Sequence, residues 1–176
     1  MGRLLAKLAG AALILGSTSY VGWQVGAQYA KRPQQLRDLQ TALAVLQTEI
    51  EYGATPLPDA LASAARAGGH AVGQLFAETA RRLAVGGGIS PGEALAASLR
   101  DWMARSAIRE ADGEVLAALV PLLGVTGRAD QVLHLELARQ RLAGEEQRAR
   151  DERERYERLA RYLGVLSGAA LVLILV

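Results

Sequence analysis

Residues 32–53, RPQQLRDLQTALAVLQTEIEYG, carry the strongest fold signal in the chain. Apolar side chains recur there in steps of three and four, at Leu36, Leu39, Leu43, Leu46 and Ile50. This spacing places one apolar stripe along an α-helix. Pro33 suits the first turn of such a helix, and Gly53 suits its C-terminal cap. The stretch therefore predicts an amphipathic helix that packs against other helices.

The turn that follows, GATPLPDAL at residues 53–61, is interpreted as a helix start. Thr55 is placed to cap a helix whose first residue is Pro56. Pro58 falls in the first turn, where no backbone donor is required. Nothing in this turn is an acid, base or nucleophile in a catalytic pattern, so a structural role is favoured.

A second turn, GISPGEAL at residues 88–95, has the same character. Ser90 can cap the helix, Pro91 takes the first position, and Glu93 completes a capping box. Four helices are expected over residues 56–67, 70–84, 91–103 and 112–124, the last kinked or shortened by Pro121. A long sixth helix is expected from about Ala129.

The sixth helix becomes almost wholly charged over EEQRARDERERYER, residues 145–158. Acids precede bases by four residues, as in Glu154 and Arg158, which is favourable on an exposed helix. This stretch is interpreted as solvated, because it lacks the apolar seam of a coiled coil. With no strand pattern anywhere, the sequence predicts an all-α bundle of six helices.

The composition excludes several classes of function. The net charge is only +2 with acids and bases intermixed, which argues against a nucleic-acid binder. There is no cysteine, and His70 and His134 stand in no metal or nucleophile motif, so both are interpreted as structural. The glycines at 86–88 are not followed by the residues of a phosphate-binding loop. We therefore expect no enzyme activity, cofactor, metal or small-molecule substrate.

Both ends of the chain are predicted to enter a membrane. Leu8 to Ala30 is uncharged over 23 residues, long enough for a helix to cross a bilayer. Leu163 to Val176, LGVLSGAALVLILV, is uncharged to the end of the chain, and Arg161 can extend it by snorkelling. The alternative for the first segment is a signal peptide cleaved after Ala27, which would leave an exported, tail-anchored helical binding domain.

Basic residues near the two segments indicate the orientation. They are Lys31, Arg32, Arg37, Arg155, Arg158 and Arg161. Because positive charge favours the cytoplasmic side, the region between the segments is expected in the cytoplasm. The predicted organisation is an anchor at 1–30, a cytoplasmic bundle at 31–158 and a membrane segment at 159–176.

Three stretches together resemble one known family. They are KRPQQLRDLQTALAVLQTEIEYGATPLPDAL, DQVLHLELARQRL and ERYERLARYLGVLSGAALVLILV. The chain resembles the stage III sporulation protein AB family over essentially its whole length. The glycine and two prolines of TEIEYGATPLPDAL, with Gly53, Pro56 and Pro58 in one register, are the most specific part. That family is similar to the cytoplasmic domain of the type II secretion F protein, an inner-membrane platform component.

The resemblance implies a scaffold in a transenvelope complex needed for endospore formation. It implies an outer forespore membrane location, with the bundle facing the mother-cell cytoplasm. The implied partners are membrane lipid, a sporulation-complex ATPase and ring-forming membrane proteins, with homo-oligomerisation left open. The candidate protein-binding surfaces are the exposed part of the proline turns, at Leu57, and a charged ridge comprising Arg148, Arg150, Arg153 and Arg155. Exposed charge of this kind is also typical of a merely solvated helix.

Overall fold

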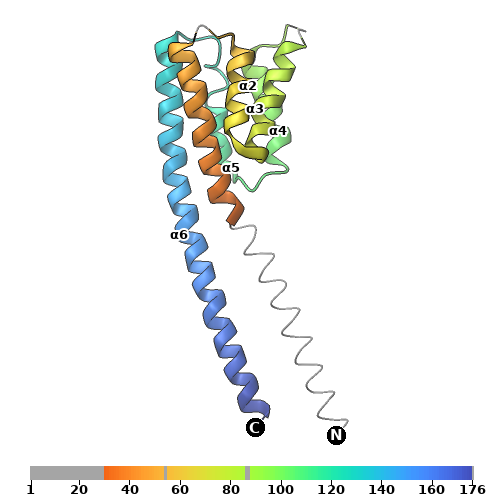
Figure 1. The fold of residues 1–176 in the computed structure, drawn as a ribbon, viewed down its shortest axis with the longest axis vertical. Helices are drawn as coiled ribbons and strands as arrows, with labels where there is room; N and C mark the ends of the chain where they lie inside the picture. Colours follow the sequence, from red (N-terminus) through yellow and green to blue (C-terminus); the bar gives the residue numbers. More distant parts are fainter. Residues whose placement is uncertain (1–29, 54, 86–87, 176) are drawn as a thin grey trace. The chain divides into compact units, whose positions relative to one another are not determined.

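The structure is a computed structural model that describes residues 30–53, 55–85 and 88–175, without the side chains of residues 161 and 164–175. Within these residues the chain forms six helices and no strand (Figure 1). The first covers residues 30–52. The others are α2 Leu57–Ala67, α3 Gly69–Ala84, α4 Pro91–Met103, α5 Glu110–Ala117 and α6 Arg128–Leu175. The all-helical fold predicted from the sequence is confirmed.

The chain divides into two compact units. The larger, Arg32–Arg148, is a helical bundle that holds most of the 30–52 helix, α2 to α5 and the first part of α6. Of the described residues, the other unit contains 30–31 and α6 from Ala149 onward. The core and the groove described below belong to the bundle.

The leucine stripe of the 30–52 helix lies in the core of the bundle. Leu36, Leu39, Leu43 and Leu46 are each exposed by no more than 1%, whereas Ile50 is half-buried. Burying each leucine contributes about 2 kcal/mol of hydrophobic free energy. The other fully buried large side chains come from every remaining helix except α4, and they include Leu61, Val72, Leu75, Leu116, Leu135 and Leu142. The predicted stripe is therefore confirmed as the surface on which the other helices pack.

α2 and α3 form a tight helical hairpin. Gly69 has a φ of +63°, a conformation that favours glycine, and it allows α3 to begin directly after α2 ends. Gly73 lies so close to α2 that an added Cβ would collide with the carbonyl oxygen of Ala65. Trp102 of α4 is buried, and its indole N–H donates to the carbonyl oxygen of Ala71 at 2.6 Å. These contacts set α4 beside α3.

The fifth helix begins two residues before the predicted start at Asp112. The Asp112 Oδ2 atom accepts a hydrogen bond from the backbone N–H of Arg109 at 2.9 Å, so Asp112 occupies the first turn of α5 instead of its start. A carboxylate in that position satisfies a backbone donor that the helix itself leaves unpaired.

The same helix ends well before the predicted Gly124. Pro121 has no N–H to donate to the carbonyl oxygen of Ala117, so the helical hydrogen-bond ladder stops there. Val120 N–H bonds to Ala117 oxygen at 3.1 Å, and turns continue to Gly124, whose φ is +77°. Pro121 thus shortens the helix, which was one of the two outcomes expected.

α6 starts one residue before the prediction, and part of its charged stretch is buried in the bundle. Glu146 is only 7% exposed, and it accepts hydrogen bonds from Arg37 Nε at 3.0 Å and Gln40 Nε2 at 2.8 Å. Arg139 Nη1 donates to Gln47 Oε1 at 3.0 Å, so α6 and the 30–52 helix run antiparallel. The solvated interpretation is therefore wrong for Glu146, while residues 153–160 are exposed as predicted.

Among residues 30–53, 55–85 and 88–175, no helix is both long and apolar enough to cross a membrane. The predicted N-terminal anchor, residues 1–30, lies outside the described residues except for its last position. Of the predicted C-terminal segment, 159–176, residues 159–175 form the end of α6, where the described side chains stop at Leu163.

Candidate functional site

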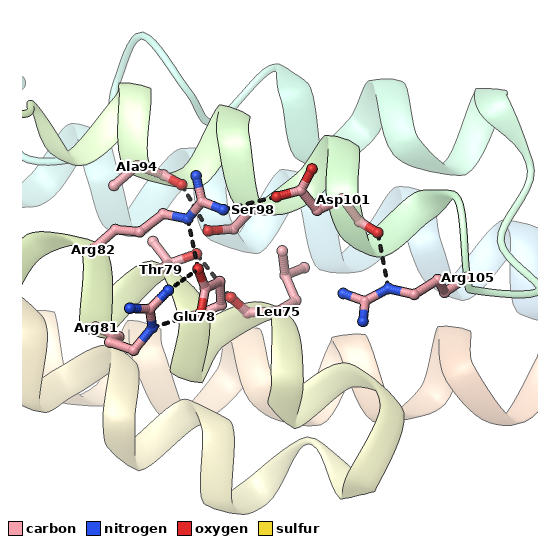
Figure 2. Close-up of polar contacts among 9 residues, drawn as sticks. All are labelled: Leu75, Glu78, Thr79, Arg81, Arg82, Ala94, Ser98, Asp101 and Arg105. Atoms are coloured by element: carbon pink, nitrogen blue, oxygen red, sulfur yellow. Dashed lines mark hydrogen bonds and ion pairs between the residues drawn. The ribbon is translucent and has the colours of Figure 1, made fainter.

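A groove between α3 and α4 is lined by charged and polar side chains from both helices. It has a volume of about 470 Å³ and is lined by Gln74, Ala77, Glu78, Arg81, Ser98, Asp101, Trp102 and Arg105. All of these residues lie on the two helices or directly after α4. Figure 2 shows Glu78 beside Arg81 and Arg82, with Arg82 reaching from α3 to Asp101 of α4.

The hydroxyl groups around the floor of the groove are already engaged. Ser98 is 1% exposed and donates to the carbonyl oxygen of Ala94 at 2.8 Å. Thr79, fully buried, donates to Leu75 oxygen at 2.8 Å (Figure 2). Since each hydroxyl bonds its own helix backbone and no base contacts it, the groove offers no activated nucleophile.

Guanidinium and carboxylate groups alternate along the rim. Glu78 accepts hydrogen bonds from Arg81 and from Arg82, both on its own helix, at 2.6 and 2.8 Å. Arg82 also donates to Asp101 of α4 at 2.7 Å, which joins the two walls (Figure 2). Arg105 is exposed and donates to the backbone oxygen of Asp101 at 3.1 Å.

The electrostatics of the rim favour recognition over catalysis. Hydrogen bonds from Arg81, together with those from Arg82, lower the pKa of Glu78 from 4.5 to about 2. Glu78 is therefore a fixed anion near neutral pH and is poorly suited to general acid–base catalysis. Together with Arg82 beside the lining residues, the rim has two carboxylates and three guanidinium groups, which leaves one positive charge in surplus. Arg81 and Arg82 bond carboxylates, and Arg105 bonds a backbone oxygen. Such a surface can bind an acidic segment of another protein.

A second polar cluster is buried at one end of the 30–52 helix. Arg32 donates from Nε and Nη2 to the two carboxylate oxygens of Asp112 at 2.9 and 2.8 Å, and from Nη2 to Glu145 at 3.0 Å. Asp112 is fully buried and Arg32 is 6% exposed. Burial lowers the pKa of Arg32, but hydrogen bonds and charge from Asp112 and Glu145 outweigh it and leave that pKa above its ordinary value. This cluster holds three helices together.

The burial of Arg32 adds a structural role to one residue of the predicted basic collar. The sequence assigns Arg32 to a set of cations near the membrane surface, whereas its guanidinium is enclosed in the bundle. Arg37, from the same set, is half-exposed and pairs with Glu146. In the fold, Arg32 is therefore a structural residue.

The first proline turn differs from the prediction at its cap. Thr55 does not cap α2, because its hydroxyl donates to Glu49 Oε2 at 2.9 Å, and Pro56 is the N-cap residue instead. The carbonyl oxygen of Pro56 accepts the first helical hydrogen bonds. Pro58 lies in the first turn of α2, and Gly53 N–H bonds Glu49 oxygen at the end of the 30–52 helix.

The second proline turn forms as the sequence predicts. Ser90 Oγ accepts a hydrogen bond from Glu93 N–H at 3.2 Å, and Glu93 Oε2 accepts one from Ser90 N–H at 2.9 Å. The bonds from Ser90 also lower the pKa of the Glu93 carboxyl. Pro91 is the first residue of α4, and it packs against Gly124.

The residues proposed from sequence as a binding surface are distributed over both units. Leu57, half-buried, starts α2, and Arg148, exposed, pairs with Glu145, both within the bundle. The other ridge residues belong to the second unit, where Arg153 pairs with Glu157 at 2.7 Å and the remaining members are Arg150 and Arg155. The structure shows local ion pairs of Arg148 and Arg153 on the ridge, and the binding role of the ridge stays a prediction.

The histidines hold no recognisable site in the described chain. His70 is exposed and contacts Gln74 at 3.2 Å, and His134 is half-buried. Within the described residues, no three potential ligands are grouped so that they could hold a metal ion.

Sequence reasoning missed the groove residues. Glu78 and Arg82 stand four apart on a helix, so their pairing was readable from spacing. The contact between Arg82 and Asp101 joins two different helices, so the spacing of residues within one helix does not predict it.

Comparisons with known proteins agree with the resemblance in the sequence. The family model described as stage III sporulation protein AB matches residues 7–176. The stage III sporulation protein AB of Bacillus subtilis (strain 168) is 32% identical over 171 residues, which cover 97% of this chain and 99% of that protein. A solved structure of a stage III sporulation protein AB is similar with a TM-score of 0.65 and 31% identity, covering 70% of this chain and 97% of that one.

Proposed function

The chain belongs to the stage III sporulation protein AB family, and on that premise we propose that it is a non-enzymatic platform protein of a secretion-like complex for endospore formation. The observation that carries the proposal is the family match over residues 7–176, which includes both uncharged ends as well as the helical bundle. The ion-paired groove, without an activated nucleophile or a general acid, fits a protein that binds other proteins.

The proposed organisation has the bundle held at a membrane by both ends of the chain. Residues 8–30 and 163–176 carry no charge, and the basic residues that flank them favour a cytoplasmic bundle. By the family resemblance the membrane is the outer forespore membrane, and the bundle has the role of the type II secretion F domain. The alternative is an exported domain whose first segment is cleaved after Ala27.

The groove between α3 and α4 is the proposed docking surface for the partner ATPase. Its rim has surplus positive charge at Arg105, and the ion pair between Arg82 and Asp101 fixes the width between the two walls. An acidic segment of the ATPase would pair with Arg105 while its apolar side chains cover the exposed edge of the groove. The charged ridge around Arg148 is the second candidate surface.

Co-purification of the full chain with the ATPase, with and without nucleotide, tests this function. We expect the ATPase to be retained and Arg105→Glu to lower retention at least tenfold, because it reverses the surplus charge. Arg66→Glu is the matched control, since Arg66 is an exposed arginine of α2 outside the groove. No retention by the wild-type chain in either condition contradicts ATPase docking. If both variants retain the ATPase equally, the docking surface lies outside the groove.

The topology is tested separately with closed membrane vesicles and the intact mass of the chain. The platform proposal expects an uncleaved N-terminus and digestion of the bundle only when protease reaches the cytoplasmic face. A chain that begins after Ala27 and is digested only from the opposite face would establish the exported alternative instead.

A further inference from the structure

α6 carries a second uncharged stripe on the side opposite the core. The stripe, termed here the outer seam, has steps of four, three and four residues and consists of Leu133, Leu137, Gln140 and Gly144. Leu133 is 55% exposed and Leu137 is 41% exposed. At 100° per residue, Leu137 and Gly144 lie about 200° from the buried Leu135 and Leu142. Thus α6 is uncharged on two opposite faces, only one of which is covered by the bundle.

Packing within the described chain does not require a glycine at position 144. It lies in the interior of α6, where glycine is less stable than alanine by about 1 kcal/mol. A Cβ added there would meet no described atom within 4 Å. By contrast, a Cβ on Gly73 or Gly92 would collide with the backbone of a neighbouring segment of the bundle. A glycine on an exposed helical seam permits close approach of a helix from another molecule.

The spacing of the outer seam matches that of a coiled coil. Steps of four, three and four place the four residues at successive core positions of a heptad pattern. Glu136 and Arg141, five residues apart, then occupy the flanking positions that pair between two parallel chains. Glu136 is 39% exposed at its side chain, and Arg141 is exposed. In a parallel, in-register pair, Glu136 of each copy faces Arg141 of the other, giving two complementary contacts.

The antiparallel arrangement is less favourable on the same seam. It would set Leu133 against Gly144 and Leu137 against Gln140, so neither leucine would meet an apolar partner. It would also lose the contact between Glu136 and Arg141. In the parallel arrangement, each leucine packs against its own counterpart. Both the apolar and the charged positions therefore select a second copy in the same orientation.

We propose that two copies of this chain pair through the outer seam of α6, parallel and in register. The seam is about 17 Å long, from the 11 steps of about 1.5 Å between residues 133 and 144, which is short for a coiled coil. The pair is consequently weak and is best detected by chemical trapping. This inference requires neither the ATPase nor the groove, and it holds or fails independently of them.

Disulfide trapping of the full chain tests the pairing, since the natural sequence has no cysteine. Single variants Leu137→Cys, Gln140→Cys and Gly144→Cys are purified in mild detergent and oxidised with copper phenanthroline. Each is expected to form a disulfide dimer at least ten times faster than Ala117→Cys, an exposed alanine at the end of α5. Cysteines facing each other across a parallel seam come close enough for a disulfide.

Other outcomes of the trapping experiment overturn the proposal. Rates equal to that of Ala117→Cys for all three variants show that the seam does not pair. Fast oxidation at only one position indicates a crossing or an antiparallel contact, because only an in-register parallel pair aligns every seam residue with itself.

Charge exchange in the Gln140→Cys background tests the register directly. Glu136→Arg or Arg141→Glu alone is expected to lower the rate of trapping about fivefold, because two exposed ion pairs become two repulsive contacts. Combining both substitutions restores attraction and should restore the rate. Circular dichroism checks that each variant keeps its helical content. Failure of the double variant to recover, with its fold intact, refutes the parallel register.

Discussion

Replacing Asp112 by asparagine tests the buried cluster that joins the 30–52 helix, α5 and α6. The carboxylate of Asp112 is fully buried and accepts two hydrogen bonds from Arg32 at 2.9 and 2.8 Å. Asparagine keeps the size of the side chain and can still accept the hydrogen bond from Arg109 N–H that starts α5. The substitution therefore removes a charge with little change in packing or helix capping.

The expected loss of unfolding free energy is about 3 kcal/mol. Removing one partner of a buried ion pair costs about 3–5 kcal/mol, because the other charge stays buried without compensation. The lower end applies here, since Glu145 still lies 3.0 Å from Arg32 and keeps part of the compensation. In the double variant Arg32→Met, Asp112→Asn, the acceptor for Arg109 N–H is kept, the buried guanidinium is gone and Glu145 still pairs with Arg148. The loss should therefore be smaller than for Asp112→Asn alone, because no unpaired buried charge remains.

Urea unfolding of the full chain in mild detergent measures this loss. Fluorescence of the buried Trp102 reports on the bundle when Trp23 is replaced by phenylalanine. A loss of about 3 kcal/mol lowers the urea midpoint by about 1.5 M at a typical slope of about 2 kcal/mol per M. The control is Asp59→Asn, an exposed acid in the first turn of α2, which should cost less than about 1 kcal/mol. Equal midpoints for the two variants would refute the structural role of the cluster.

Three other predictions concern the bundle. Gly92→Ala should destabilise the bundle by about 1–3 kcal/mol in thermal unfolding, because the new Cβ would collide with a backbone carbonyl. Gly144→Ala should instead stabilise α6 by up to about 1 kcal/mol. In an NMR titration, Glu78 should ionise near pH 2, and Arg81→Gln should raise that midpoint. The contribution of Glu78 to stability is therefore complete above about pH 4.5 and disappears as the pH falls toward 2. Ser90→Ala should cost about 1 kcal/mol in thermal unfolding, since the side-chain cap is lost. The pKa of Glu93 should rise only in part, because the backbone N–H of residue 90 still donates to its carboxylate and only the hydroxyl bond is removed.

The parts of the fold that depend on neighbouring residues were predictable from sequence. The leucine stripe of residues 32–53 specifies a buried face because its period is that of a helix. The cap at Ser90 and Glu93 is present because both partners lie within one turn of each other. Thr55 shows the limit of this reasoning, since its hydroxyl had two acceptable partners nearby. The hydroxyl donates to the carboxylate of Glu49 on the preceding helix instead of capping the backbone of α2.

The candidate site was not predictable, because it depends on contacts between helices. The groove exists where α3 and α4 pack side by side, and the ion pair between Arg82 and Asp101 spans 19 positions in the sequence. The outer seam of α6 was missed for a different reason. Its two leucines alternate in sequence with residues that pack on the core, and the exposure of Leu133 and Leu137 in the fold, against the burial of Leu135, identifies a second face.

Arg32 shows why a charge pattern and a fold can use the same residue differently. Directly after an uncharged stretch, Arg32 belongs to the basic residues that favour a cytoplasmic orientation. In the folded bundle, its guanidinium is buried between Asp112 and Glu145. The two uses do not conflict, because in the proposed membrane topology the charge of Arg32 would act during insertion, before distant segments such as α5 and α6 pack. The structural role of Arg32 therefore leaves the proposed orientation unchanged, with the guanidinium enclosed in the bundle.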